Sequence, residues 1–194
     1  MSRSLTHYLE QQIPLSEEEL LFLADNIPEE KILKHTLLLA AGQISQAFYF
    51  VVKGCVRMYY LVDGVEKTTF FYTEGAFVSS YKSFIQQVPA PHFLQTVEDT
   101  CLSVISTESA HQLLQLFPRF EFLARVAMES ELSVYQDMIA SFVTLNAEQR
   151  YLKLSKMQPD LLQRIPQHFI ATYLGVSPET LSRIRKRVHQ KGIS

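Results

Sequence analysis

The 194-residue chain has little cysteine and no long hydrophobic run. Its two cysteines, Cys55 and Cys101, form no CxxC pair and no disulfide framework, which fits a reducing compartment and predicts a cytoplasmic protein. An iron–sulfur centre is excluded because it needs about four cysteine ligands. Uncharged apolar runs such as 48–52 are far shorter than the ~20 residues of a membrane helix. Residues 1–12 lack the apolar segment of a signal peptide, so we expect no membrane partner.

Histidine is also sparse. The six histidines are scattered, and no HxH or HxxxH spacing occurs. Only His35 and His92 fall in the predicted β region, too few for the histidine-rich metal site of a cupin-type dioxygenase. Ser, Cys and His show no triad pattern. The sequence therefore predicts no metal site, no catalytic residues and no enzyme; haem held by a single histidine is the alternative that these counts leave open.

Acidic and basic residues are unevenly divided along the chain. Residues 1–145 hold 9 Lys and Arg against 17 Asp and Glu, a balance of −8. Residues 146–194 hold 9 against 3, a balance of +6. A small basic end on an acidic body is typical of a segment that binds a polyanion such as nucleic acid. A basic tail that only aids solubility would give the same balance.

The first 118 residues combine a helix with many short strands. Residues 16–26 predict a helix, because a capping box precedes its apolar face. From about residue 31, short β-type runs are separated by single glycines, and Asp63-Gly64 predicts a type I′ hairpin turn. Residues 76–91 are not strand-like, and residues 92–106 add one or two strands. This pattern predicts a β-sandwich or a jelly-roll barrel.

The sequence after residue 106 has a helical period. Residues 108–117 predict a short helix that ends at Pro118, and residues 119–145 follow without proline or glycine. A helix of that length spans about 40 Å, which suits a spine between domains or a dimer seam. Packing against the barrel alone is the alternative. Asn146 is expected to cap the next helix. The apolar residues assigned to the seam are Leu123, Val126, Val134 and Met138.

Residues 167–186 match the steric template of a helix-turn-helix. The template requires a small residue where the two helices touch, here Ala171, and usually a glycine in the turn, here Gly175. Ser177 stands at the N-cap of the second helix and Pro178 in its first turn. A helical hairpin that matches by chance is the alternative. Five apolar positions build the shared core: Ile170, Leu174, Val176, Leu181 and Ile184.

The outward residues of the second helix are candidates for contacts to DNA, because the first turns of such a helix enter the major groove. Arg183 can donate two hydrogen bonds to guanine, and Glu179 can accept one from cytosine. As an alternative, an acid in a first helical turn stabilises the helix dipole. Arg187 is expected at phosphate, where contacts position the protein without reading sequence; as an alternative, it only solvates the helix end. The candidate set is Ser177, Pro178, Glu179, Ser182, Arg183, Lys186 and Arg187.

The order of a cap helix, a glycine-punctuated barrel, a long helix and a helix-turn-helix resembles the Crp/Fnr-type transcription regulators over nearly the whole chain. The resemblance implies an α+β protein. It would have an N-terminal double-stranded β-helix (jelly roll) of the cyclic-nucleotide-binding type, a long dimerisation helix and a C-terminal winged helix-turn-helix. The corresponding parts are residues 1–118, 119–145 and 146–194. The matching segments are FVVKGCVRMYY at 50–60, DG at 63–64, EGAFV at 74–78, QTVEDTCL at 95–102 and IATYLGVSPETLSRIRK at 170–186.

One departure from the family pattern concerns the ligand. Family members that bind cyclic nucleotides carry a Gly-Glu pair and a later Arg, which hold the ribose and the phosphate. Here the Gly-Glu slot is Ser79-Ser80, the Arg slot lies near Ala90-Pro91, and residues 58–118 contain no Arg. A buried phosphate without a paired cation is costly, so cAMP and cGMP are not expected as cofactors. The candidate effector pocket is Ser79, Ser80, Tyr81, Lys82 and His92.

Two further departures concern DNA. Pro178 stands where many relatives carry an Arg before the Glu, so we expect the operator to differ from the usual half-site of the family. Few residues follow Lys191, so a β-wing is expected to be short or absent.

These features together predict a homodimeric, sequence-specific DNA-binding transcription regulator, modulated by an unidentified small molecule rather than by cAMP. Its expected partners are a near-palindromic double-stranded operator and a second copy of the chain, with RNA polymerase as a further candidate. The alternative is a cyclic-nucleotide-domain-like binding or interaction module without specific DNA binding.

Overall fold

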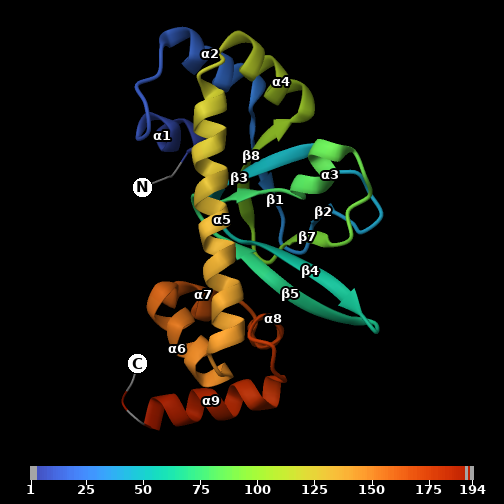
Figure 1. Cartoon of the computed structure of the whole chain (residues 1–194), viewed down its shortest axis with the longest axis vertical. Helices are drawn as coiled ribbons and strands as arrows, with labels where there is room; N and C mark the ends of the chain where they lie inside the picture. The colour runs from blue at the N-terminus through green and yellow to red at the C-terminus, as the bar shows by residue number, and fades with distance from the viewer. Residues whose placement is uncertain (1–3, 191, 193–194) are drawn as a thin grey trace. The chain divides into compact units, whose positions relative to one another are not determined.

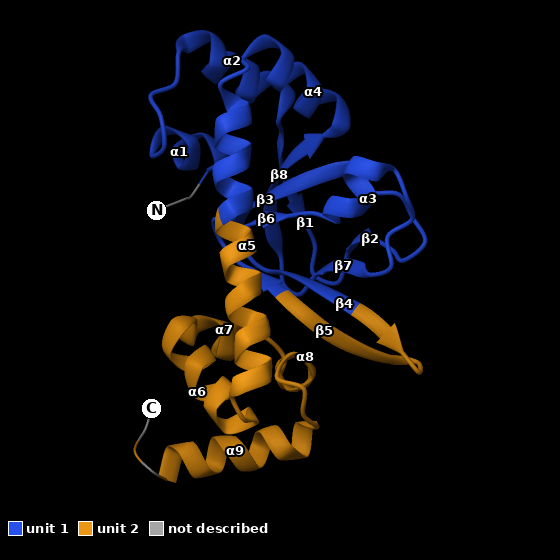
Figure 2. Ribbon diagram, viewed as in Figure 1, with its two compact units in different colours: residues 1–59, 71–129 blue, residues 60–70, 130–194 orange. Residues whose placement is uncertain are grey.

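The computed structural model describes residues 4–190 and 192 of the chain. Figure 1 shows a β-rich part, a long helix and a group of shorter helices. The described residues form two compact units, one from 4–59 and 71–129 and the other from 60–70 and 130–192 without 191 (Figure 2). This division cuts through a β-hairpin and through the long helix, whereas the predicted domain boundaries lie at residues 118 and 145.

Two four-stranded sheets make up the β-rich part and confirm the predicted jelly roll. One sheet has the order β1-β8-β3-β6 and the other β2-β7-β4-β5. Strand β3 pairs antiparallel with β8 from Ala47 opposite Ser106 to Lys53 opposite Cys101, with a bulge after Val51. The strands are β1 Glu29–Ile32, β2 Leu37–Leu39, β3 Ala47–Lys53, β4 Val56–Val62, β5 Val65–Tyr72, β6 Phe77–Val78, β7 Phe93–Thr96 and β8 Thr100–Ser106.

The turn between β4 and β5 has the predicted type I′ signature. Asp63 and Gly64 have φ values of 51° and 75°, and this turn requires a positive φ at both central residues. Asp tolerates the left-handed region better than most residues, and glycine enters it without steric cost. The hairpin prediction is therefore confirmed.

Among the described residues, two helices precede the first strand, and six helices follow the last strand. The predicted strand-free stretch at 76–91 contains the short strand β6 and helix α3. Helix α1 was not predicted from the sequence, because its six residues are too few to show a clear period. The helices are α1 Leu5–Glu10, α2 Glu17–Asn26, α3 Tyr81–Gln86, α4 Thr107–Leu116, α5 Phe120–Thr144, α6 Ala147–Met157, α7 Pro159–Arg164, α8 Gln167–Tyr173 and α9 Pro178–Gln190.

The core of the first unit joins the N-terminal helices, one sheet and the start of α5. Buried side chains of α2, β3 and α5 belong to one apolar cluster, and Phe50 is completely buried within it. Leu123 of α5 is a member of this cluster and is only 6% exposed. The first turns of α5 are therefore part of the core of this unit. The cluster is Leu5, Leu9, Leu23, Ile27, Phe50, Val52, Phe120 and Leu123.

An ion pair between the buried Glu19 and the partly exposed Arg119 ties the start of α2 to the residue before α5. Glu19 completes the predicted capping box, accepting from the Ser16 backbone N–H at 2.7 Å while its own N–H donates to Ser16 Oγ. Its other oxygen accepts from Arg119 Nε at 2.6 Å. Burial raises the pKa of Glu19, but the hydrogen bonds from Arg119 and Ser16 outweigh it, so the net pKa lies below the ordinary value.

Within residues 4–190 and 192, no helix combines the length and the apolar character that crossing a membrane requires.

The Glu19–Arg119 pair makes the stability of the chain pH-dependent. A carboxyl group whose pKa is lowered by folding stabilises the folded chain above its unfolded pKa, and this contribution is lost as pH falls through the folded pKa. We expect Glu19→Gln to lower the free energy of unfolding at pH 7 by about 1.5–3 kcal/mol, the range for a hydrogen bond to a charged group. The difference from wild type should shrink as pH falls below 4.5, the ordinary value for this group.

Urea unfolding at pH 7 and at lower pH measures this difference. Glu18→Gln is the matched control, because Glu18 is an exposed acid on the same helical turn. A Glu19→Gln difference that stays constant with falling pH, or that Glu18→Gln reproduces, would show that the ion pair does not stabilise the fold.

Candidate nucleic-acid interface

The predicted helix-turn-helix is formed by α8 and α9. Ala171 is completely buried where the two helices meet, as the template requires. Val176 is half-buried and Gly175 is exposed in the turn. The remaining apolar template positions are all at most 5% exposed: Ile170, Leu174, Leu181 and Ile184.

The turn between α8 and α9 satisfies its own backbone. Gly175 has a φ of 70°, and its N–H donates to the Thr172 carbonyl at 3.0 Å. The Val176 N–H donates to the Ala171 carbonyl at 3.0 Å. These are the two hydrogen bonds of a Schellman motif, which ends a helix with a left-handed residue and pairs its last carbonyls. Glycine is required here because a side chain at this φ is strained.

Helix α9 begins as the sequence predicts. The Thr180 N–H donates to Ser177 Oγ at 3.3 Å, so Ser177 is the N-cap. Pro178 is the first helical residue, where its missing N–H would have no intrahelical partner. The first turn of α9 is thus fixed by local contacts of its own residues.

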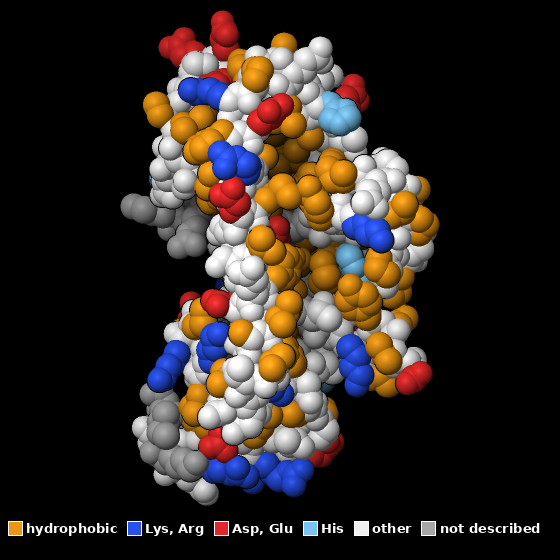
Figure 3. All heavy atoms as spheres, viewed as in Figure 1, with side chains coloured by type: hydrophobic (Ala, Val, Ile, Leu, Met, Phe, Trp, Pro, Cys, Tyr) orange, Lys and Arg blue, Asp and Glu red, His pale blue; other side chains and the backbone are white. Residues whose placement is uncertain are grey.

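One face of α9 is buried and the opposite face is open. Leu181, Ile184 and Val188 are buried. Blue spheres of Lys and Arg gather over α9 in Figure 3. The seven residues predicted to contact DNA are all exposed: Ser177, Pro178, Glu179, Ser182, Arg183, Lys186 and Arg187.

The two candidate base readers are restrained by neighbouring side chains. Arg183 Nη2 donates to Thr180 Oγ1 at 3.2 Å. Hydrogen bonds from the Ser177 side chain and from the backbone N–H of Glu179 itself lower the pKa of Glu179, and the charge of Arg183 acts in the same direction. Glu179 is therefore anionic at neutral pH, which is the state that accepts a hydrogen bond from cytosine N4.

Arg187 has a partner that the sequence did not predict. Its Nη1 donates to Glu148 Oε2 of α6 at 2.7 Å, and its side chain is 58% exposed. No local pattern signals this pair, because the two residues are 39 positions apart. To contact a phosphate, Arg187 must therefore either release Glu148 or divide its guanidinium between Glu148 and the phosphate.

The five candidate effector residues differ in burial. Ser80 and His92 are buried, Ser79 is half-buried, and Tyr81 and Lys82 are exposed. Burial lowers the pKa of His92. A cavity of about 240 Å³ lies elsewhere in the same unit, and none of the five lines it. Its lining residues are Leu5, Thr6, Leu23, Ala24, Ile27, Pro28, Glu29 and Ser103.

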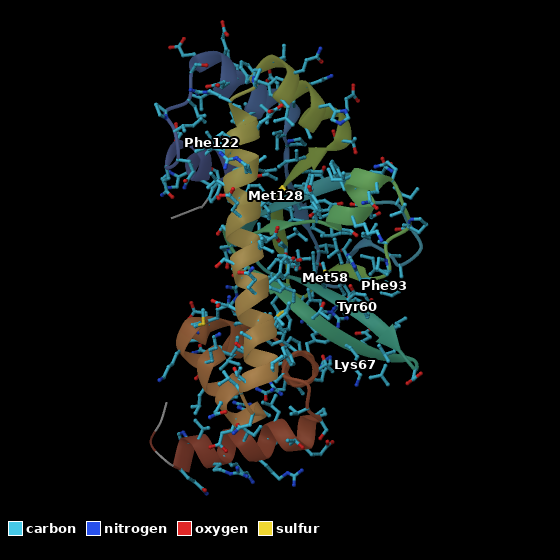
Figure 4. The ribbon with its side chains drawn as sticks, viewed as in Figure 1. Met58, Tyr60, Lys67, Phe93, Phe122 and Met128 are labelled. Atoms are coloured by element: carbon cyan, nitrogen blue, oxygen red, sulfur yellow. The ribbon has the colours of Figure 1, made fainter. Side chains whose placement is uncertain are left out.

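A buried arginine in the barrel was not among the predicted site residues. Arg57 of β4 is 1% exposed, and its Nη2 donates to Gln95 Oε1 of β7 at 2.7 Å. Its guanidinium carbon lies 4.0 Å from the centre of the Tyr59 ring, which stacks on Phe93 at 4.8 Å. Figure 4 marks Phe93 and the neighbouring Met58. Gln95 and Tyr59 thus hold this cation inside the sheet.

Metal ligands do not gather in the described part of the chain, where no group of three or more His, Cys, Asp or Glu could hold an ion.

The residues assigned to the dimer seam occupy different environments on α5. Leu123 packs in the core of its own unit, so it is not available to a second subunit and we remove it from the seam. Val126 and Met138 are half-buried and Val134 is 47% exposed. Another apolar set on α5 is more exposed, at spacings of seven and four residues: Leu132 at 57%, Ile139 at 61% and Val143 at 79%.

Comparisons with known proteins agree with this architecture. A family model described as a cyclic nucleotide-binding domain matches residues 29–116. The solved structure of FixK2 from Bradyrhizobium japonicum superposes with a TM-score of 0.73 at 20% identity, covering 86% of each chain. The global regulator CLP of Xanthomonas campestris superposes with a TM-score of 0.71 at 20% identity, covering 91% of this chain and 93% of that one. At these identities the structures show the fold alone.

Curated relatives extend the match in sequence. The anaerobic regulatory protein of Haemophilus influenzae is 29% identical over 193 residues, covering 92% of this chain and 74% of that protein. The fumarate and nitrate reduction regulatory protein of Escherichia coli K12 is 30% identical, covering 92% of this chain and 76% of that protein. The fold, the helix-turn-helix and these relatives agree: the chain belongs to the Crp/Fnr family and is a transcription regulator rather than an enzyme.

Proposed function

We propose that the chain is a homodimeric regulator that binds a near-palindromic duplex through α9. The observation that supports this most directly is the two-sided character of α9. Its apolar side is buried against the helix-turn-helix core, and its open side carries all seven candidate contact residues. A helix fixed in this way can enter the major groove with its first turns while its charged residues meet the backbone.

Within this proposal, Arg183 reads guanine through its planar fork and Glu179 accepts from cytosine. Ser177, Pro178 and Ser182 lie on the same open side and contact the groove wall. Lys186 and Arg187 meet phosphates, where each neutralised charge releases counterions and makes binding salt-dependent.

A dimer explains the expected two-fold operator. Two copies related by a two-fold axis present two α9 helices, and their half-sites lie about 34 Å apart, one turn of DNA. We assign the seam to Leu132, Ile139 and Val143, because exposed apolar side chains repeated along one helix mark a coiled-coil contact. Met128, marked in Figure 4, lies one turn before Leu132 and is 42% exposed.

The partners and ligand follow from the same proposal. A DNA-binding regulator works in the cytoplasm, with RNA polymerase as a partner. Its effector is a small molecule other than cAMP, since the nucleotide slot has serines in place of the expected Gly-Glu pair and Lys82 is exposed.

Substitution of Arg183 tests base reading. Arg183→Ala should weaken binding to a duplex selected by the wild-type chain by about 1–3 kcal/mol per half-site and relax selectivity at one base pair. Lys186→Ala, the matched loss of an exposed charge on the same helix, should weaken selected and random duplexes about equally and reduce the salt slope. Titrations by fluorescence anisotropy measure both. If Arg183→Ala weakens the two duplexes by the same factor, Arg183 is a phosphate anchor instead.

Charge placed in the seam should separate the subunits. Leu132→Glu and Ile139→Glu each bury a carboxylate in an apolar contact, so we expect monomers by sedimentation velocity. Ser133→Glu adds the same charge at an exposed position on another side of α5 and should leave the dimer intact. Dimers that persist in both seam variants would move the interface away from this face.

Calorimetric titration with cAMP and cGMP should show no binding. Among the predicted effector residues the only lysine is exposed, and Gln95 and Tyr59 already hold Arg57. A dissociation constant in the micromolar range for either nucleotide would overturn this part of the proposal.

A further inference from the structure

Arg150 of α6 lies between the C-terminal ends of two other helices. Its Nη1 donates to the carbonyl of Leu145, the residue that follows α5, at 2.6 Å. Its Nη2 donates at 2.8 Å to the carbonyl of Leu174, the last residue before the turn glycine of the helix-turn-helix. One guanidinium thus connects the end of the long helix with the end of α8.

The chemistry of these two carbonyls suits a cation. The last carbonyls of a helix have no intrahelical donor and carry the negative end of the helix dipole. A planar guanidinium has donors in a fixed fork, so it can serve two acceptors in different directions at once. Phe142 of α5 supports the group from one side, with its ring centre 4.7 Å from the guanidinium carbon.

The guanidinium is enclosed beside the turn. Its Nε is buried, and its two terminal nitrogens donate to the Leu145 and Leu174 carbonyls. A Cβ placed on Gly175 would lie 3.8 Å from Nη2 and 3.5 Å from the Phe142 ring, so the turn packs directly against this cation. The turn that sets the angle between α8 and α9 is therefore in contact with Arg150.

Two further side-chain contacts connect α6 with α5 and with α9. Lys153 Nζ donates to Ser141 Oγ of α5 at 2.7 Å, and Glu148 accepts from Arg187 of α9 at 2.7 Å. Arg150 is the member of this set that contacts the turn region itself.

We propose that Arg150 is a positioning residue for DNA recognition: by joining the Leu145 and Leu174 carbonyls, it fixes the helix-turn-helix on the end of α5 in the orientation that matches the operator. This inference rests on the proposed function, because it assigns Arg150 to the geometry of the DNA-binding surface. Arg150 touches no base and acts through the placement of α9.

The experiment uses the full chain and duplexes that the wild type selects from a random pool. Arg150→Met removes the charge and the donors, and Arg150→Lys keeps the charge without the fork. We expect both variants to bind the selected duplex about tenfold to a hundredfold more weakly, the effect of losing one or two base contacts. Binding to random duplex should stay within about twofold, because the exposed phosphate-binding charges of α9 are unchanged.

Two controls separate positioning from folding and from charge. Circular dichroism at the titration temperature checks that the variants are folded. Lys156→Met removes one exposed cation from the same helix and should leave the ratio of selected to random affinity unchanged. A loss of that ratio in folded Arg150→Met and Arg150→Lys supports the proposal.

Three results would overturn the proposal. Arg150→Lys could behave as the wild type, which would make charge alone sufficient. Arg150→Met could weaken selected and random duplexes equally, which would make Arg150 a phosphate contact. Folded Arg150→Met could bind both duplexes as tightly as the wild type does, which would exclude positioning. If the wild type itself binds no duplex, the proposed function fails, and this outcome is distinct from the other three.

Discussion

The left-handed turn at Gly175 is the constraint on which the recognition surface depends. Its two backbone hydrogen bonds end α8 and fix the direction in which the chain continues into α9. Because that geometry is set by the backbone, the apolar faces of α8 and α9 meet over Ala171, which is completely buried. The open face of α9 is a consequence, since burial of Leu181, Ile184 and Val188 leaves the charged residues outward.

Helix α6 makes contacts through charged side chains both to this motif and to the end of α5. Arg150 reaches the ends of α5 and α8, Lys153 reaches Ser141 of α5, and Glu148 reaches Arg187 of α9. Polar contacts of this kind are specific in direction, whereas apolar packing alone tolerates sliding. In the proposed complex, Arg187 would serve both Glu148 and a phosphate, so salt would act on both contacts.

Local patterns in the sequence predicted the parts that depend on neighbouring residues. The capping box at Ser16, the hairpin turn at Asp63-Gly64 and the helix-turn-helix template are each contained within about twenty residues, so the sequence alone shows them. The pairs Glu19–Arg119 and Glu148–Arg187 join distant segments, and no spacing rule reveals them.

The sequence alone also did not show which side of α5 is available to a second subunit. Helix α5 carries apolar residues on more than one side, so its period does not tell which side the chain itself covers. The structure places Leu123 in the core and leaves Leu132, Ile139 and Val143 open.

The most direct test of the account is the affinity of the wild-type chain for duplex DNA at two salt concentrations. We expect a duplex selected from a random pool to bind at least about a thousandfold more tightly than random duplex, the lower end for specific regulators. Both affinities should fall as salt rises, because phosphate contacts release counterions. Equal affinity for the two duplexes, or no binding to either at low salt, would contradict sequence-specific recognition by α9.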